Sequence, residues 1–213
     1  MNKSSYLIVI FVITSLGLVF GQSHIGVFGG MNYSKLAGDA PQDVSYGSTI
    51  GFNSGAYFDL QINKSIILSL QPFYSQEGAK ILYNVDGVDE LVDSARLRLN
   101  YFSIPLIVKV NTVKERFYAL AGIETGLLLN SYALINEKEE DINASIAQWN
   151  MAMHFGVGMR IPIGVPRLFV ELRYSQGLVN LTDDPLGDNL IPRVKTSGLK
   201  VLAGIEIPLK SKK

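Results

Sequence analysis

His154 is the residue of this chain whose type most readily suggests chemistry. Together with Ser103, Glu124 or Glu171, it offers the nucleophile, base and acid types of a hydrolytic or acyl-transfer site. Such a site needs hydrogen bonds that join the nucleophile, the base and an orienting group, and nothing in the sequence fixes that geometry. We therefore predict that His154 is a hydrogen-bonded residue inside the fold, and we predict no catalytic residue and no enzyme activity.

Two clusters of carboxylates suggest calcium binding. Residues 86–93 hold Asp86, Asp89, Glu90 and Asp93, and residues 183–188 hold three more aspartates. The alternate spacing of an EF-hand loop, closed by a glutamate at its twelfth position, is missing. We predict solvated acidic loops, without a metal site or a cofactor. The chain also has no cysteine, which excludes zinc–thiolate centres, cysteine nucleophiles and a disulfide framework.

Signals for nucleotide and nucleic-acid binding are missing as well. The glycine-rich stretches GVFGG and FGVG precede no predicted helix, whereas a phosphate loop requires one. The formal net charge is zero, and no basic patch carries interleaved aromatic residues. We expect no nucleic-acid partner.

The polar residues named above lie in segments with a period of two, which is typical of strands. In NMAMHFGVGMRIPIG (residues 150–164), the odd positions from Met151 to Ile161 are apolar, while the even ones hold His154, Arg160 and glycines. Eight segments behave in this way: residues 24–34, 48–62, 65–78, 96–111, 117–132, 146–163, 167–179 and 195–209. They are long for strands of soluble proteins, which average about five or six residues.

The connections between these segments alternate in length. Residues 63–64, 112–116 and 164–166 form short turns, whereas residues 35–47, 79–95, 133–145 and 180–194 form long polar connections. An up-and-down barrel of the outer membrane has this arrangement, with short periplasmic turns and long external loops. No internal apolar run approaches the roughly 18 residues of a membrane helix. We predict an all-β fold, an eight-stranded antiparallel up-and-down transmembrane β-barrel.

Eight charged residues within the strands fall opposite the apolar face. They comprise four acids and four bases: Asp59, Lys109, Glu124, Arg160, Glu171, Arg173, Lys200 and Glu206. The lumen of an eight-stranded barrel is just wide enough for side chains to fill it, and buried charges must be paired. We therefore predict a plugged lumen with an ion-pair network, in which glycines leave room for the long charged side chains. The apolar faces become the lipid belt.

The two ends of the predicted barrel differ in charge. The long connections and their borders hold thirteen acidic and five basic residues, whereas the short turns and the C-terminus hold seven basic residues and Glu115. Aromatic residues near both ends suggest interfacial girdles: Tyr33, Phe52, Tyr74, Tyr132, Trp149 and Tyr174 at the long loops, and Phe117, Tyr118 and Phe169 at the short turns.

The N-terminus has the features of an export signal. Lys3 precedes an apolar run from Tyr6 to Phe20, and Val19-Phe20-Gly21 permits cleavage before Gln22. We predict a signal peptide at residues 1–21 and a barrel domain at residues 22–213. His24 would then be an exposed terminal residue. A retained membrane anchor is the alternative.

Six stretches resemble, in order and spacing, the PorT-like outer-membrane β-barrel family of Bacteroidota: GVFGGMNYSKLAGD, LSLQPFYSQEG, LNYFSIPLIVKV, YALAGIETGLLL, FGVGMRI and VELRYSQGLVNL. The resemblance covers essentially the whole predicted mature chain. It implies an eight-stranded barrel in the bacterial outer membrane and assigns no activity. The chain lacks the terminal aromatic residue that is usual in such barrels.

We expect a monomeric structural or partner-binding component, in contact with outer-membrane lipid and with an extracellular protein or ligand at its long loops. Two alternatives remain open. A lipid-modifying barrel enzyme would use His154 and neighbouring polar residues, and a soluble secreted lipocalin-like carrier would place its apolar residues inside.

Overall fold

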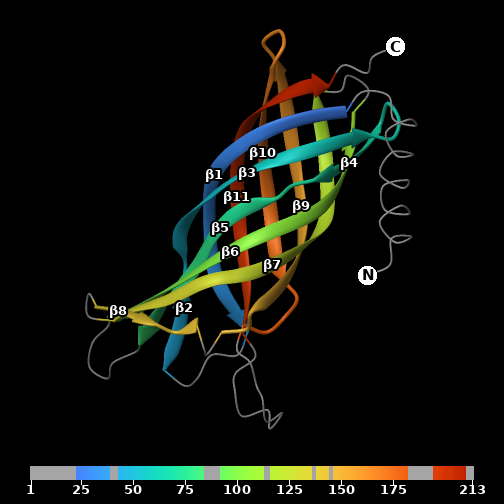
Figure 1. Cartoon of the computed structure of the whole chain (residues 1–213). Helices are drawn as coiled ribbons and strands as arrows, with labels where there is room; N and C mark the ends of the chain where they lie inside the picture. The colour runs from blue at the N-terminus through green and yellow to red at the C-terminus, as the bar shows by residue number, and fades with distance from the viewer. Residues whose placement is uncertain are drawn as a thin grey trace, which may run out of the picture.

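A computed structural model describes residues 23–38, 43–83, 92–112, 116–135, 138–143, 146–181 and 194–209. These residues form eleven strands (Figure 1): β1 (Ser23–Gly38), β2 (Val44–Gly47), β3 (Thr49–Gln61), β4 (Ile66–Leu70), β5 (Phe73–Tyr83), β6 (Val92–Asn111), β7 (Phe117–Ile135), β8 (Lys138–Asp141), β9 (Trp149–Pro162), β10 (Arg167–Gly177) and β11 (Val194–Leu209). None of the described residues belongs to a helix that could cross a membrane. The predicted signal peptide, residues 1–21, lies outside the described residues.

The strands close into a ring of antiparallel neighbours. Along the ring, β1 pairs with β3 and β11, β11 with β10, β10 with β9, β9 with β7 and β7 with β6; β4 and β5 then join β6 to β3. Ser23 lies opposite Leu209, so the first and last strands close the wall. Because β4 and β5 share one place in the ring, and β2 and β8 only extend it, the wall has eight strands. The predicted fold class is confirmed.

The break between β4 and β5 explains one difference from the predicted segments. Residues 65–78 were expected to form one strand, but Gln71-Pro72 interrupts it. Proline has no N–H for a ladder. Here the Pro72 carbonyl accepts from Ala56 N at 3.0 Å, and Gln71 N donates to the Pro105 carbonyl at 3.1 Å. The wall therefore stays hydrogen-bonded across the break.

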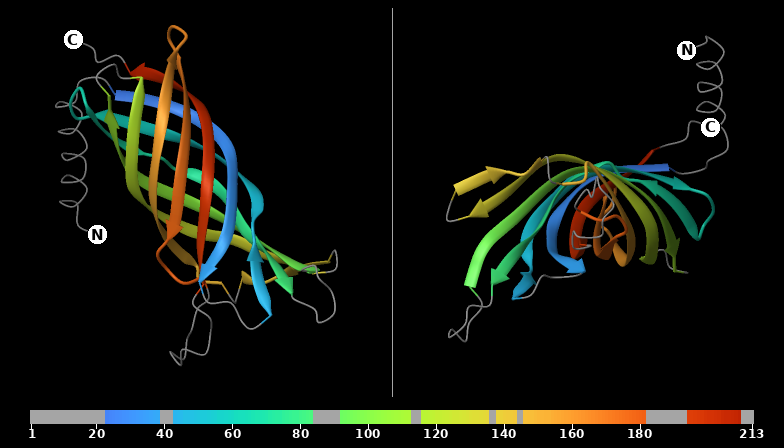
Figure 2. Two further views of the ribbon diagram at one scale, coloured as in Figure 1. Left: turned by 180° about the vertical axis from the view of Figure 1, so that it is seen from behind. Right: turned by 90° about the horizontal axis from the view of Figure 1, so that it is seen from below.

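The strands also continue further toward the long-loop end than predicted. β5 reaches Tyr83, β6 starts at Val92 and β7 reaches Ile135. Two short strands, β2 and β8, pair with β5 and β7 within segments predicted as loops. Figure 2 shows the β7–β8 hairpin, in yellow, standing out from the barrel in both views. Hydrogen bonding between strands therefore continues beyond the apolar segments from which the strand ends were predicted.

The two faces of each strand are distributed as a membrane barrel requires. Phe155 and Val157 are 51% and 58% exposed, whereas His154, next to Phe155 on the opposite face of the strand, is fully buried. The other strands repeat this alternation, with apolar side chains outside and polar ones inside. The lipocalin-like alternative predicts the opposite distribution and is wrong.

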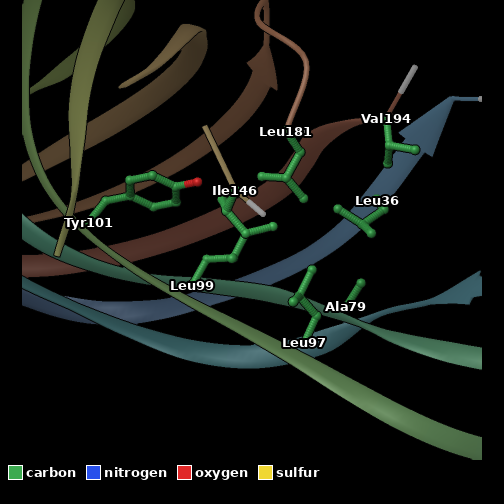
Figure 3. Packing of buried hydrophobic residues seen from close by; sticks show 8 residues of the cluster. All are labelled: Leu36, Ala79, Leu97, Leu99, Tyr101, Ile146, Leu181 and Val194. Atoms are coloured by element: carbon green, nitrogen blue, oxygen red, sulfur yellow. The ribbon is translucent and has the colours of Figure 1, made fainter. Parts of the chain in front are cut away.

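The long-loop end of the lumen holds an apolar cluster (Figure 3), which we call the apolar cap: Leu36, Ala79, Leu97, Leu99, Tyr101, Ile146, Leu181 and Val194. Ile146 and Leu181 come from segments between strands. Backbone bonds from Ala147 N to Leu181 O (2.8 Å) and from Leu181 N to Val194 O (2.7 Å) hold these segments inward. Tyr46 packs against the cap, and burial raises the pKa of its phenol.

Aromatic residues depart from the girdle prediction at the short-turn end. Phe117 is exposed, as predicted, but Tyr118 and Phe169 are buried in the lumen. Phe169 belongs to a second apolar cluster with Phe28, Tyr57, Phe73 and Leu202. Strand periodicity explains the error, because Tyr118 and Phe169 share the parity of Glu124 and Glu171 on the inner face.

Candidate functional site

The candidate site is the charged interior of the barrel. All eight charged residues predicted for the inner face are buried, with exposed fractions of 5% or less. The structure adds Glu77, which continues the alternation of Ser69, Gln71 and Ser75 along the inner face. The signal for Glu77 was therefore present in the sequence, because it has the parity of Ser69 and Gln71 within the segment predicted at residues 65–78.

Lys109 stands at the centre of one charged group. Its Nζ lies 3.0 Å from Asp59 Oδ2 and 3.5 Å from Glu171 Oε1. Glu171 also accepts from Tyr118 Oη at 2.6 Å and from Arg173 Nε at 2.7 Å. The ammonium lies 4.8 Å from the centroid of the Tyr57 ring, a separation suited to a cation–π contact. Each buried charge in this group therefore has an opposite charge beside it.

Glu206 gathers a second group near the short turns. Its carboxylate lies 3.2 Å from Arg160 Nε and 2.9 Å from Arg167 Nε, and Tyr57 Oη lies 3.3 Å from its Oε2. His24 contacts Arg167 and is only 6% exposed. The prediction that His24 is an exposed terminal residue is wrong, because it occupies an inner-face position of β1. Arg167, predicted only as part of the basic end, joins the interior network.

Lys200 and His154 form a third group with Glu77 and Glu124. Lys200 Nζ lies 3.0 Å from Glu77 Oε1 and 3.6 Å from Glu124 Oε2. Glu124 Oε2 also contacts His154 Nε2 at 2.6 Å, while its Oε1 accepts from Ser103 Oγ at 2.9 Å. The carboxylate thus occupies the centre of this group.

This third group tests the hypothetical hydrolytic site directly. The structure brings together Ser103, Glu124 and His154, but Glu171 belongs to the Lys109 group. A nucleophilic triad places the histidine between the nucleophile and the acid; here the acid lies between them. His154 Nδ1 has no hydrogen-bond partner among the described residues, so no group orients the ring from its other side. This arrangement suits a structural hydrogen-bond network.

Glycines on the inner face make room mainly for aromatic rings. Tyr57 pairs with Gly26, Tyr118 with Gly158 and Phe169 with Gly204. A Cβ at Gly158 would lie 2.2 Å from Cζ of the Tyr118 ring, closer than any real contact. The predicted role, leaving room for charged side chains, holds at Gly156, opposite Arg173. The sequence pattern thus identified the need for space but not most of its occupants.

Metal binding has no support among the described residues, where no group of three or more histidine, aspartate or glutamate side chains is placed to hold an ion. The predicted acidic clusters of residues 86–93 and 183–188 fall outside the residues whose side chains are described.

Comparisons with known proteins agree with this architecture. The family model described as outer membrane protein beta-barrel domain matches residues 20–183. Neisserial surface protein A is similar in structure, with a TM-score of 0.52 and 15% identity over 88% of this chain and 98% of that one. Ail, the attachment invasion locus protein of Yersinia pestis, gives a TM-score of 0.45 and 14% identity over 87% of this chain and 99% of that one.

No curated protein matches the chain. The structural likeness to Neisserial surface protein A, at 15% identity, shows the fold alone, and the family match adds the membrane. The chain belongs to the outer membrane protein beta-barrel domain family, and its location is the bacterial outer membrane.

Proposed function

We propose that this protein is a closed outer-membrane barrel, a monomer without enzyme activity, whose interior supports the wall and whose acidic long-loop end binds an external partner. Residues 1–21 would direct its export, and the PorT-like group would be its subfamily. The short turns would face the periplasm, as in other barrels of this class.

Burial of the luminal charges carries this proposal. Arg173, Lys109, Lys200, Glu171 and Glu206 are each 1–2% exposed. In a water-filled channel these side chains would be in contact with solvent. They instead neutralise one another in groups that include side chains from β3, β6, β7, β10 and β11. A polar lumen filled in this way supports a closed barrel.

The apolar cap provides a second barrier at the long-loop end. Leu99 and Tyr101 are 0% and 1% exposed, and Ile146 and Leu181 pack against the same cluster. An ion entering from this end would meet apolar side chains before it reached the charged groups. Because removing its hydration shell there is costly, the cap opposes conduction.

Conductance in a planar lipid bilayer tests the closed lumen. We expect no stepwise conductance from the refolded protein. Tyr101→Ala removes a ring from the cap and should give small, brief openings, whereas Phe102→Ala, next in sequence but 43% exposed on the lipid face, should give none. Stable conductance steps from the unaltered protein would contradict a closed lumen.

Charge supports the choice of a basic external partner. All four residues of β8 are charged and exposed, and three of them, Glu139, Glu140 and Asp141, are acidic. Among the described strands, β8 ends the strand order of the sheet and pairs with β7 alone, and its charges protect that edge against further strand pairing. The described acids therefore offer side-chain recognition of a cationic surface.

A lysine-rich peptide is a suitable first probe of this end. We expect salt-sensitive binding to the nanodisc-embedded protein, weakened when Glu139, Glu140 and Asp141 are changed to their amides. Replacement of Lys64, exposed in a short turn, by glutamine is the matched control at the other end. The basic-partner proposal would be refuted if the protein did not bind the peptide. It would also be refuted if the protein bound heparin, which is a polyanion, as strongly as the peptide.

A further inference from the structure

The seam that closes the barrel has an ordered outer surface near the long-loop end. Strands β1 and β11 pair along their whole length, as the blue and red strands in the left view of Figure 2 show, and β10 pairs with β11 on its other side. On the outer faces of these strands, Leu199 lies opposite both Tyr33 and Tyr174. Because tyrosine favours the membrane–water interface, this row of three side chains marks the edge of the lipid belt.

The length of the apolar face of β1 supports this level. Its outward side chains change from apolar to aromatic to basic in the order Ile25, Val27, Gly29, Met31, Tyr33 and Lys35. From Ile25 to Tyr33 the strand extends about 26 Å at roughly 3.3 Å per residue. Strand tilt shortens this height, which then fits within a membrane belt about 25 Å tall. Side chains that follow Tyr33 toward the long loops therefore lie at headgroup level.

Polar side chains form the next row of the seam. Ser197 lies opposite both Gln176 and Lys35, and Lys195 has the same parity on β11. Side chains that lie opposite one another in this way have Cβ atoms about 5 Å apart. Ser197 is only 6% exposed, although it has the parity of the outward Leu199, so its short side chain lies between longer ones. An anion above Ser197 is therefore close to hydroxyl, amide and ammonium groups together.

Hydrogen bonds fix the orientation of the Gln176 amide. Its Oε1 accepts from Tyr174 Oη at 2.7 Å, and its Nε2 donates to the Gly177 carbonyl at 3.3 Å. Because an amide nitrogen carries two hydrogens, one N–H remains for another acceptor. The amide oxygen is thus already used by Tyr174, and the amide offers a donor to a ligand.

The charge of this surface is positive within the described residues. The described residues of β1, β10 and β11 include two acids, Glu171 and Glu206, and both are buried in the lumen beside basic partners. Lys35 and Lys195 have no carboxylate partner in the part of the chain that the structure describes. Two ammonium groups therefore belong to the outer surface of these strands without an acid opposite them.

We infer that the donor patch, formed by Lys35, Gln176, Lys195 and Ser197, binds the phosphate of an anionic lipid headgroup in the leaflet at the long-loop end. Lysine binds phosphate as a point charge, and basic side chains close to a membrane surface attract anionic headgroups. A headgroup on the donor patch contacts β1 and β11, the two strands that close the barrel. This inference concerns the outer wall and goes beyond the proposed binding of an external partner.

Native mass spectrometry of the detergent-solubilised protein, titrated with phosphatidic acid or phosphatidylcholine, measures the binding directly. We expect tighter retention of phosphatidic acid. Lys35→Gln should raise its apparent Kd about fivefold, the effect of losing one basic residue beside an anionic headgroup. Lys64→Gln removes the same charge from an exposed short turn and should leave the Kd within about twofold.

Lys195→Gln, on the other strand of the seam, gives a second measurement should Lys35→Gln not reach the heat-modifiable folded form, and it should weaken retention by a similar factor. Equal retention of the two lipids would overturn the inference, as would equal weakening by the Lys64 and Lys35 changes. Displacement of the lipid by millimolar inorganic phosphate would show a free-anion site and refute the assignment to lipid.

Discussion

Removing the cation of Lys109 should destabilise the barrel more than removing both members of its ion pair. Lys109→Met keeps the length of the side chain but leaves Asp59 buried without its 3.0 Å partner. Asp59 would retain the Ser69 hydroxyl and Arg160 Nη2, the latter at 4.0 Å. Glu171 would keep Arg173 and Tyr118, so the cost falls mainly on Asp59.

The magnitude follows from the loss of the nearest opposite charge beside Asp59. Removing one partner of a buried ion pair reduces the free energy of unfolding by about 3–5 kcal/mol. This range applies because both Lys109 and Asp59 are buried, with exposed fractions of 1–2%. The second change, Asp59→Asn, removes the unpaired carboxylate and retains an acceptor for Ser69. The double variant should therefore be more stable than Lys109→Met alone, by about 1–3 kcal/mol.

Urea unfolding in lipid vesicles gives the required free energies, with Trp149, the one tryptophan of the chain, as the fluorescent reporter. Heat-modifiable mobility on gels reports the folded fraction independently. The control, Lys64→Met in a short turn, should change the free energy of unfolding by about 0.5 kcal/mol or less. If the effects of the two luminal changes add to within about 0.5 kcal/mol, the pairing argument is refuted.

Two further predictions concern the inner and outer faces. Gly158→Ala should cost about 1–3 kcal/mol by overpacking, since its Cβ would displace the Tyr118 ring. Gly29→Ala on the outer face, where the nearest atom lies 3.7 Å away, should be neutral or stabilising in the same urea titration. Val157→Arg, in the apolar belt, should reduce stability by about 2–4 kcal/mol, while Ile163→Arg at the short-turn end should cost about 1 kcal/mol or less; equal losses would contradict the membrane placement.

Strand periodicity was sufficient to predict the wall of the barrel. Every predicted segment has a counterpart, and the ends of the segment predicted at residues 195–209 agree to one residue with β11. The inner-face charges followed from the same period, because one parity fixes one face for a whole strand. The pairing of opposite charges was predictable in kind, since an unpaired buried charge is costly.

Individual partners were not predictable in the same way. The basic residue that pairs with Asp59 is determined by the stagger of the strands around the barrel. This stagger places Lys109 Nζ, fifty residues away in the sequence, 3.0 Å from Asp59 Oδ2. The apolar cap was missed because Leu181 lies outside any period-two segment. Periodicity also does not show where a ladder stops: β3 and β5 pair only from Asn53–Ser75 to Gly55–Phe73, although both strands are longer.

These limits indicate where binding can evolve on such a barrel. An eight-stranded wall leaves room inside only for side chains. The buried charged side chains are also difficult to replace, because changing one of them leaves its partner buried without an opposite charge. Glu171, for example, serves Lys109, Arg173 and Tyr118 together, so altering it disturbs three residues. The exposed side chains of β8 have no such constraint, since Glu139 and Glu140 can change without leaving a buried charge unpaired. Recognition is therefore expected at the long-loop end, and the interior is expected to keep its register and shape.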